Sequence, residues 1–162
     1  MDAIVITVST SAAAGEAEDV SGPKLARLIE NAGLIGGHVE NITVADNQGA
    51  IVTALHDAIS SGAKLVLTTG GTGFSTDDVT PEATREVIER EAQGLAEAIR
   101  ADAAKHIMTG ILTRGVAGIA GSTLIINLPG SPKAVEESFS VLAPVLPHAL
   151  AQLGGTGGRD RH

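Results

Sequence analysis

The fold of this chain is decided by Leu65-Val-Leu-Thr-Thr-Gly-Gly-Thr-Gly-Phe-Ser-Thr-Asp-Asp-Val-Thr-Pro-Glu-Ala-Thr84. The short apolar run at its start predicts a buried strand, and a glycine-rich turn follows. Thr80 suits the N-cap of a helix and Pro81 its first position, where a missing N–H costs nothing. A strand, a glycine turn and a helix start, in this order, predict a phosphate-binding loop, because backbone N–H groups can approach an anion there.

Two acids in the same turn, Asp77 and Asp78, would repel a bare phosphate. A divalent cation would reverse this effect, so the turn predicts a site for a magnesium–nucleotide complex. The turn is not a Walker loop, because no Gly-Lys-Ser/Thr follows, and it lacks the Rossmann G-x-G-x-x-G spacing. A tight strand-to-helix connection without a ligand is the alternative. The candidate nucleotide contacts are Gly70, Gly71, Thr72 and Gly73.

The composition is typical of one aliphatic α/β domain: of the 162 residues, 43% are hydrophobic and 20 are glycine. Phe74 and Phe139 are the only aromatic residues, so the stacking platform of single-strand-binding proteins is missing. A net charge of −8 argues against nucleic acid or an anionic membrane as partner. Without cysteine there is no disulfide, thiolate nucleophile or zinc–thiolate site.

We expect a single domain over residues 1–153, followed by a flexible, glycine-rich tail over residues 154–162. Met1-Asp2 runs directly into a strand, with no charged-then-apolar leader. No apolar run approaches the roughly 18 residues that cross a membrane. These features predict a cytoplasmic protein that has no contact with a membrane.

The first strand is predicted at residues 3–8, a continuous apolar run of the kind found in parallel strands covered on both faces. Its end carries Ser9, Thr10 and Ser11, at the start of a small-residue loop that reaches Asp19. Ligands of open α/β sheets bind beyond the carboxyl ends of the strands. The three hydroxyls are therefore candidate ligand contacts, and a solvated loop with local Ser/Thr turns is the alternative.

Hydrophobic periodicity and helix-capping residues predict the remaining elements. Strands are expected at residues 38–44, at an edge position over 115–122, and at 123–128. Helices are expected at residues 21–33, 47–61, from 81 onward, 94–104, 134–142 and 144–153, and residues 106–114 have no clear period. Strands that alternate with helices predict a three-layer α/β/α domain with a mostly parallel sheet.

Asp46 follows the second strand and directly precedes a helix, so a plain N-cap is the simplest role for it. The loop Pro129-Gly130-Ser131 follows the last strand, with Ser131 as cap and Pro132 at the first helical position. Because crossovers are right-handed, Asp46, the glycine turn and this loop should gather at one edge of the sheet. Arg114 is a candidate phosphate contact, although arginine is more often a surface residue.

Nearly the whole chain, residues 3–153, resembles the MogA/MoaB family of molybdenum cofactor biosynthesis proteins. The matching marks come in family order: Glu18-Asp-Val-Ser-Gly-Pro23, Val44-Ala-Asp46, residues 68–84, Leu112-Thr-Arg114, and Asn127-Leu-Pro-Gly-Ser-Pro-Lys133. The resemblance implies a molybdopterin-binding-like fold and a homotrimer, with other cofactor-biosynthesis proteins as possible partners. It also implies transfer of AMP from Mg-ATP to the terminal phosphate of molybdopterin, with release of pyrophosphate.

The two acids on which the family relies correspond to Asp46 and Asp78. The phosphate nucleophile is already anionic, so we assign both acids to Mg²⁺ and not to proton transfer. Alignment of the two anions and neutralisation of their charge are then what the site must supply. The candidate substrate contacts are Ser9, Thr10, Ser11, Arg114, Pro129, Gly130 and Ser131.

The sequence departs from the family at one point. Members commonly carry Pro-Arg-Asp before Val-Thr-Pro, whereas here Thr76-Asp77-Asp78 stands in that place. Asp77 could take part in metal binding, or the lost arginine could slow or abolish catalysis. A trimeric homologue that binds molybdopterin or a protein partner without catalysis is therefore the alternative function. Flavodoxin-like electron transfer is disfavoured, because aromatic residues that would flank a flavin are nearly absent.

Overall fold

The computed structural model describes residues 3–155. They form one sheet of six strands: β1 (Ala3–Val8), β2 (Val39–Val44), β3 (Leu65–Thr69), β4 (Arg90–Glu91), β5 (Ala117–Ala120) and β6 (Thr123–Leu128), in the order β2-β1-β3-β6-β5-β4. The first four strands in this order are parallel, β5 is antiparallel to β6, and β4 is antiparallel to β5. The expected mostly parallel sheet is confirmed.

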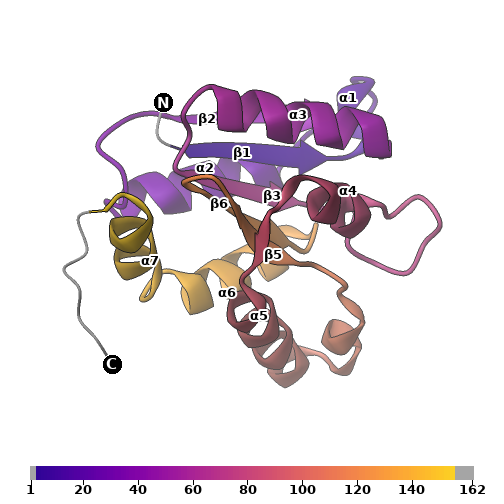
Figure 1. The fold of residues 1–162 in the computed structure, drawn as a ribbon. Coiled ribbons are helices and arrows are strands. Elements are labelled where there is room, and N and C mark those ends of the chain that lie inside the picture. The colour runs from indigo at the N-terminus through magenta and orange to yellow at the C-terminus, as the bar shows by residue number, and fades with distance from the viewer. Residues whose placement is uncertain (1–2, 156–162) are drawn as a thin grey trace.

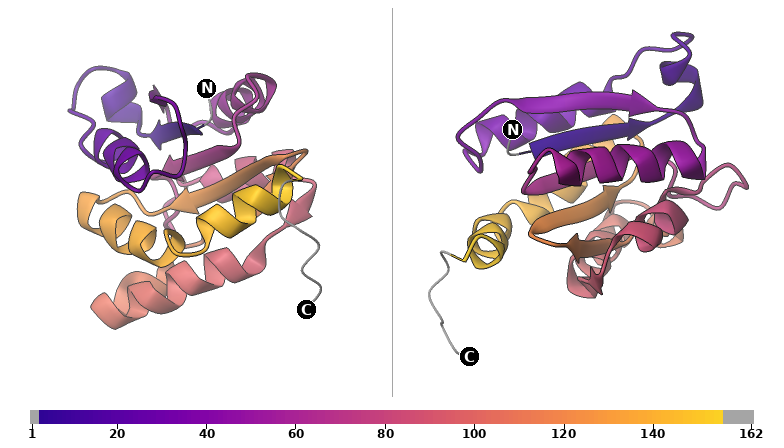
Figure 2. Two further views of the ribbon diagram at one scale, coloured as in Figure 1. Left: turned by 90° about the vertical axis from the view of Figure 1, so that its left-hand side faces the viewer. Right: turned by 45° about the horizontal axis from the view of Figure 1, so that its top comes forward.

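Helices cover both faces of the sheet, which confirms the three layers (Figures 1 and 2). The helices are α1 (Thr10–Ala13), α2 (Ser21–Asn31), α3 (Gln48–Ser60), α4 (Thr80–Val87), α5 (Gln93–His106), the 3₁₀ helix η1 (Met108–Leu112), α6 (Pro132–Leu142) and α7 (Leu146–Leu153). Apolar side chains of α2, α5, α6 and α7 pack on one face of the sheet. Those of α3 and α4 pack on the other face.

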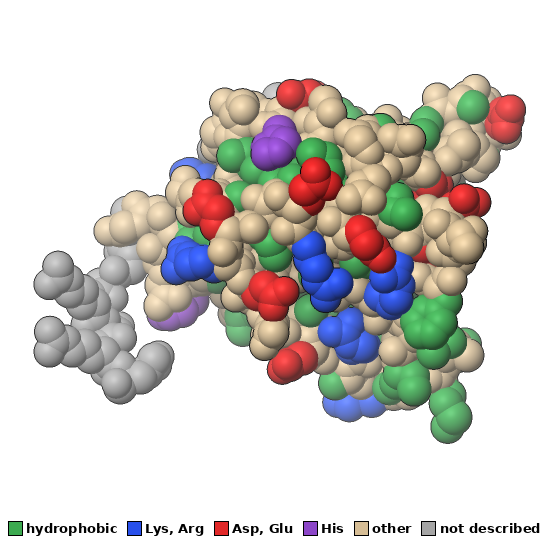
Figure 3. Space-filling model, turned by 45° about the vertical axis from the view of Figure 1, so that its right-hand side comes forward, with side chains coloured by type: hydrophobic (Ala, Val, Ile, Leu, Met, Phe, Trp, Pro, Cys, Tyr) green, Lys and Arg blue, Asp and Glu red, His purple; other side chains and the backbone are tan. Residues whose placement is uncertain are grey.

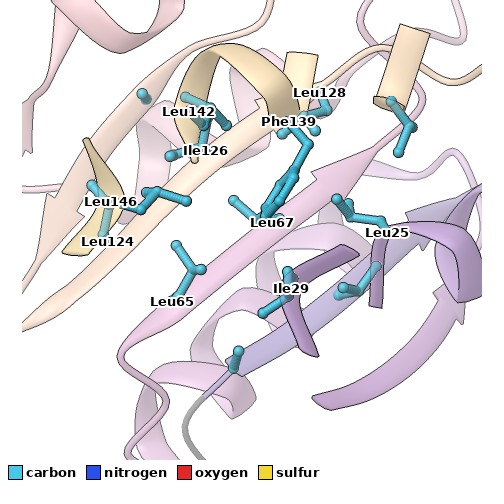
Figure 4. Close-up of a cluster of buried hydrophobic side chains, with 14 of the residues drawn as sticks. Leu25, Ile29, Leu65, Leu67, Leu124, Ile126, Leu128, Phe139, Leu142 and Leu146 are labelled. Carbon is cyan, nitrogen blue, oxygen red and sulfur yellow. The ribbon is translucent and has the colours of Figure 1, made fainter. Parts of the chain in front are cut away.

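The core is aliphatic, as the composition requires. Every residue of β1, β3 and β6 is buried, because these strands are covered on both faces. Figure 4 shows Leu67 of β3 and Leu128 of β6 pointing toward Phe139 of α6, with Leu25 and Ile29 of α2 on the same face. Phe139 is the one aromatic side chain in this cluster.

The strand register brings four strand ends to the same edge of the sheet. Val8 is the partner of Val44, Thr7 is the partner of Thr69, and Thr69 is the partner of Leu128. The chain runs from β1 to β2 on one side and from β3 to β4 on the other side, so β1 and β3 flank the point where the winding reverses. Ligand crevices of open α/β sheets form at such a point.

Two of the expected helix caps are wrong. Asn47, not Asp46, caps α3, and its side chain accepts a hydrogen bond from the Ala50 N–H. Thr80 lies inside the first turn of α4, whose N-cap position is Val79 without a side-chain bond. In both places the predicted cap side chain bonds to a different part of the chain, described below.

Two further segments differ from the expectation, and a third has no predicted element. The loop after β1 begins with the short helix α1, because the Ser9 hydroxyl accepts a hydrogen bond from the Ala12 N–H and so caps it. The strand expected at an edge is internal: β5 pairs with β6 on one side and with the two-residue strand β4 on the other. Residues 106–114, which lack a clear period, contain η1.

Most of the expected C-terminal tail, residues 156–162, lies outside the described residues. Across residues 3–155, no helix combines the length and the apolar character needed to cross a membrane. The cytoplasmic location stays a prediction.

Asn127 is a polar residue at the centre of the sheet, and only 3% of it is exposed. Its amide donates to the hydroxyls of Thr68 and Thr84, at 3.0 Å each, and accepts from the Val116 N–H at 3.1 Å. The Thr84 hydroxyl donates onward to the Thr80 carbonyl at 2.8 Å. A single buried side chain thus joins β3, β6, α4 and the start of β5.

Replacement of Asn127 by leucine, which has a similar size, leaves these buried groups without their partner. We expect the free energy of unfolding to fall by about 3 kcal/mol, because each unpaired buried group costs about 1–3 kcal/mol. Urea unfolding followed by far-UV circular dichroism measures the loss. Asn31→Leu, at the exposed end of α2, is the control and should change stability by no more than about 0.5 kcal/mol. Equal effects of the two changes would contradict the structural role of Asn127.

Candidate functional site

The glycine turn after β3 has a shape that requires glycine. Gly70 and Gly71 have φ angles of 98° and 67°, in the left-handed region that other residues rarely adopt. A Cβ at Gly70 would overlap the Val8 carbonyl, and one at Gly71 would overlap the Thr80 hydroxyl. Thr80 holds the turn from α4: its N–H donates to the Gly71 carbonyl (3.1 Å) and its hydroxyl donates to the Gly70 carbonyl (3.0 Å).

The same turn presents free hydrogen-bond donors. The Gly70 N–H donates to the Leu128 carbonyl. Within residues 3–155, the next three N–H groups, those of Gly71, Thr72 and Gly73, donate to no protein acceptor. Consecutive N–H groups of a glycine turn form a concave site for an anion. The turn therefore has the donors that a phosphate-binding loop needs.

The loop after β6 lies against the glycine turn. The Thr69 hydroxyl donates to the Pro129 carbonyl (2.8 Å), and the Ser21 hydroxyl donates to the Gly130 carbonyl (2.6 Å). A Cβ at Gly130 would lie 3.2 Å from Gly70 Cα, so the two loops touch backbone to backbone. Ser131 caps α6 through the Ala134 N–H, and Pro132 opens the helix, as the sequence predicts.

A cavity of about 430 Å³ lies beside the glycine turn, within the size range of ligand pockets. Its walls come from the two loops, the end of α5, η1 and the start of α6: Gly70, Gly71, Thr72, Gly73, Asp78, Ala103, Ile107, Thr109, Gly110, Leu112, Thr113, Pro129, Gly130, Ala134 and Glu137. Its two ionisable lining residues, Asp78 and Glu137, are both acids. A phosphate in this cavity would need a cation beside it. The wall formed by η1 and α6 is a part of the site that sequence reasoning missed, since residues 106–114 show no periodicity.

A second cavity, of about 360 Å³, lies on the other side of Gly70 and Gly130, which line both cavities. It is lined by the ends of β1 and β3, with Ser9 and Thr69, and by the segment that leads into α2. Asp19 lines it and accepts hydrogen bonds from the Gly22 N–H, from Asn41 and from Thr43. Sequence reasoning did not single out Asp19, although the spacing from Asp19 to Gly22 is that of a helix cap.

Asp46 is joined to the loop after β1. One of its carboxylate oxygens accepts from both the N–H (3.0 Å) and the hydroxyl (3.1 Å) of Thr10. The Asp46 N–H donates back to the same hydroxyl at 3.0 Å, and the Ser9 and Ser11 hydroxyls lie 3.3 Å apart. Within the described chain no hydrogen bond joins Asp46 to Asp78, and Asp46 lines neither cavity. The structure thus brings the two loops of the larger cavity together and places Asp46 with Thr10.

Asp78 lies at the end of the glycine turn, where one carboxylate oxygen accepts from the Ser75 N–H (3.0 Å). Arg114 reaches the same turn from the segment before β5. Its guanidinium donates to the carbonyls of Gly73 (2.8 Å) and Asp78 (2.7 Å) and to the carboxylate of Glu82 (2.6 Å). This hydrogen bond from Arg114 lowers the pKa of Glu82 below its ordinary value. The sequence predicts that Arg114 contacts a ligand phosphate. In the structure its guanidinium instead bonds to three groups of the protein.

One side of the larger cavity has an apolar rim. Figure 3 shows hydrophobic side chains gathered at the lower right of the face where η1 and the glycine turn lie. Five large apolar residues of these two segments are exposed, from Leu112 at 43% to Met108 at 83%: Phe74, Ile107, Met108, Ile111 and Leu112. Ile107 and Leu112 also line the cavity. Such a rim offers contact area to a flat ring, beside a loop that offers donors to a phosphate.

The carboxylates near the glycine turn fit Mg²⁺ only if substrate phosphates supply further ligands. Within residues 3–155, no three His, Asp or Glu side chains gather closely enough to hold a metal ion by themselves. Mg²⁺ is usually bound by one or two carboxylates together with substrate phosphates. Asp46 and Asp78 each keep one carboxylate oxygen without a protein donor in this part of the chain. Asp78, on the wall of the larger cavity, fits a metal ion that arrives with a phosphate ligand, whereas Asp46 lines neither cavity and stays a predicted metal ligand.

Comparison with known proteins identifies the family of the chain. Residues 4–148 match the family described as "Probable molybdopterin binding domain". The chain is 40% identical over 136 residues to the molybdopterin adenylyltransferase of Haemophilus influenzae, covering 83% of this chain and 69% of that protein. It is 42% identical over 151 residues to the Drosophila melanogaster molybdenum cofactor synthesis protein cinnamon, covering 93% of this chain and only 25% of that protein.

The fold is also close to that of solved structures of the same family. The solved structure of the molybdopterin biosynthesis Mog protein from Mycobacterium ulcerans superposes with a TM-score of 0.88 at 43% identity, covering 94% of this chain and 98% of that one. The family match spans most of the chain, and the site has the loops by which the sequence resembles that family. The chain belongs to the MogA/MoaB family of molybdopterin-binding proteins of molybdenum cofactor biosynthesis.

Proposed function

We propose that this protein transfers AMP from Mg-ATP to the terminal phosphate of molybdopterin. An oxygen of that phosphate forms a bond to the α-phosphorus of ATP, the bond between the α-phosphorus and the bridging oxygen breaks, and pyrophosphate leaves. The attacking phosphate is already anionic, so no base has to remove a proton. The site has to align two anions and lower their repulsion.

The observation that carries the proposal is the row of free N–H groups at Gly71, Thr72 and Gly73, on the wall of the larger cavity. These groups are fixed before a ligand binds, because Thr80 and Leu128 hold the turn in place. Preorganised donors stabilise charge on a phosphoryl group without reorganisation during the reaction. They support a nucleotide phosphate at this turn.

Asp46 and Asp78 are the proposed metal-binding residues. When bound, Mg²⁺ would neutralise part of the triphosphate charge. Asp78 lines the larger cavity, and Thr10 orients the Asp46 carboxylate at the end of β2, which β1 separates from β3. Asp78 supplies the carboxylate that supports a cation there, since Glu137, the second acid of the lining, already lies near His106 (3.5 Å) and Lys133 (3.9 Å).

The smaller cavity offers room for part of the second substrate. It shares Gly70 and Gly130 with the larger cavity, so ligands in the two cavities would meet at this pair of glycines. Ser9 lines the smaller cavity, and Pro129 the larger. Thr10, Ser11 and Ser131 lie in the same strand-end loops and stay proposed substrate contacts.

A homologue that binds molybdopterin without catalysis is the second candidate. Its support is Asp77, an exposed acid in the glycine turn where family members commonly carry arginine. The deciding experiment is incubation with molybdopterin and Mg-ATP, followed by detection of adenylylated molybdopterin and pyrophosphate by mass spectrometry. Product supports the enzyme, and binding of molybdopterin without product supports the second candidate.

Asp→Asn changes test the two proposed metal ligands. Asparagine keeps an acceptor oxygen and loses the charge, so Asp46→Asn and Asp78→Asn should remain folded and make product roughly 100-fold more slowly. Higher Mg²⁺ should restore part of the rate. Asp77→Asn, the same change one residue away, should lower the rate of product formation less than Asp78→Asn does. Full activity of both Asp46→Asn and Asp78→Asn would contradict the metal assignment, and a loss confined to Asp77→Asn would move that assignment to Asp77.

Gly71→Ala tests the phosphate loop. Its Cβ would displace the Thr80 hydroxyl and distort the turn, so affinity for Mg-ATP in isothermal titration calorimetry should fall by about tenfold or more. Gly121→Ala is a matched control, because Gly121 has a φ of 59° but no atom within 4 Å of an added Cβ. Both variants carry the same kind of backbone strain. Equal ATP affinity of the two variants would mean that the turn does not bind the nucleotide.

The homotrimer implied by the family is proposed for this chain as well. Light scattering coupled to size-exclusion chromatography should give three times the mass of one chain, 16.3 kDa. Concentration must be read by refractive index, because the chain has neither Trp nor Tyr. A monomer mass at micromolar concentration would contradict the trimer.

A further inference from the structure

The outer part of the glycine turn, residues 73–78, projects from the carboxyl edge of the sheet (Figure 1). Residues 74–77 are exposed. Inside this segment, the Asp78 N–H donates to the Ser75 carbonyl and the Ser75 N–H donates to the Asp78 carboxylate, at 3.0 Å each. Within residues 3–155, the hydrogen bonds from residues 73–78 to the rest of the chain all come from one side chain, Arg114.

Arg114 joins the first and last residues of this segment. Its Nε donates to the Gly73 carbonyl at 2.8 Å, and a terminal nitrogen donates to the Asp78 carbonyl at 2.7 Å. The other terminal nitrogen donates to the Glu82 carboxylate at 2.6 Å, and the Arg114 N–H donates to the Thr72 carbonyl at 2.8 Å. One planar group thus fixes the distance between the two ends of the segment.

We propose that Arg114 is a positioning residue, which holds the segment 73–78 so that the Asp78 carboxylate stays at the cavity wall. The guanidinium bonds to the Asp78 carbonyl and leaves the carboxylate to a ligand. Each of its three nitrogens already donates to the protein, so a substrate phosphate is not needed to explain its position. The catalytic consequence of this role rests on the proposed function.

Arginine suits this task and lysine does not. The three acceptors surround the planar guanidinium, whose donors point in fixed and divergent directions. A lysine ammonium is a single point of charge and could reach only part of this set. Glu82 supplies the balancing charge from α4, and its lowered pKa reflects the hydrogen bond from Arg114. The positioning role therefore depends on the shape of the side chain, whereas contact with phosphate depends mainly on its charge.

Hydrogen–deuterium exchange in the absence of substrates tests the positioning directly. Arg114→Lys and Arg114→Gln should both speed exchange in the peptide that covers residues 73–79, and should leave β1 and β3 unchanged. Arg27→Gln is the matched control, because Arg27 is exposed on α2 and has no ion pair or hydrogen bond to a described side chain. Wild-type exchange in both Arg114 variants would overturn the proposal.

Kinetics separate positioning from direct phosphate contact. If Arg114 positions Asp78, both variants should lower kcat about tenfold or more, because small displacements of reacting groups are costly. Both should also raise the Mg²⁺ concentration that gives half-maximal rate, with a smaller change in KM for ATP. Lysine would preserve a contact that relies on charge, so near-normal activity of Arg114→Lys would overturn the proposal.

Glu82→Gln gives results of opposite sign under the two roles. Removal of the balancing charge weakens the hold on Arg114, so we expect faster exchange over residues 73–79 and a higher Mg²⁺ requirement. A phosphate-binding Arg114 would instead be freed from Glu82, and KM for ATP would fall. A lower KM with unchanged exchange would overturn positioning. Absence of product from the unmodified protein would contradict the proposed function alone, because the exchange experiment needs no substrate.

Discussion

Thr80 donates two hydrogen bonds to consecutive carbonyls of the glycine turn, and the geometry of the site depends on them. They hold Gly70 and Gly71 in a left-handed backbone conformation that residues other than glycine rarely adopt. The Thr80 carbonyl in turn accepts from Thr84, and Thr84 accepts from the buried Asn127. The shape of an exposed turn is thereby tied to the centre of the sheet, and loosening it would require breaking buried hydrogen bonds.

The sheet explains why the site lies where it does. Strands buried on both faces accommodate polar side chains only where these are hydrogen-bonded, as Thr68 is to Asn127 and Thr69 is to the Pro129 carbonyl. Polar and glycine residues therefore gather beyond the strand ends, and the parallel register brings those ends to one edge. The loops after β3 and β6 touch there, and the two cavities open on either side of their contact.

The charges of the protein and of its proposed substrates have the same sign. The chain carries a net charge of −8, and the larger cavity is lined by two acids. Three free N–H groups offset this locally, and a cation shared between carboxylates and phosphates would offset it further. Arg114 and Glu82 neutralise each other beside the turn, so they add shape to the site without adding net charge.

The sequence by itself determined the elements whose signals are local. Apolar runs marked β1, β3 and β6, the glycines marked the turn, and Ser131 with Pro132 marked the start of α6, since each pattern reports on neighbouring residues. Only the tertiary structure decided what Asp46, Thr80 and Arg114 do. Their partners are Thr10, the Gly70 carbonyl, and the carbonyls of Gly73 and Asp78, which lie from 10 to 41 residues away along the chain. The fold brings those partners within hydrogen-bond distance. A side chain that could cap the helix next to it in sequence then bonds to a distant group instead.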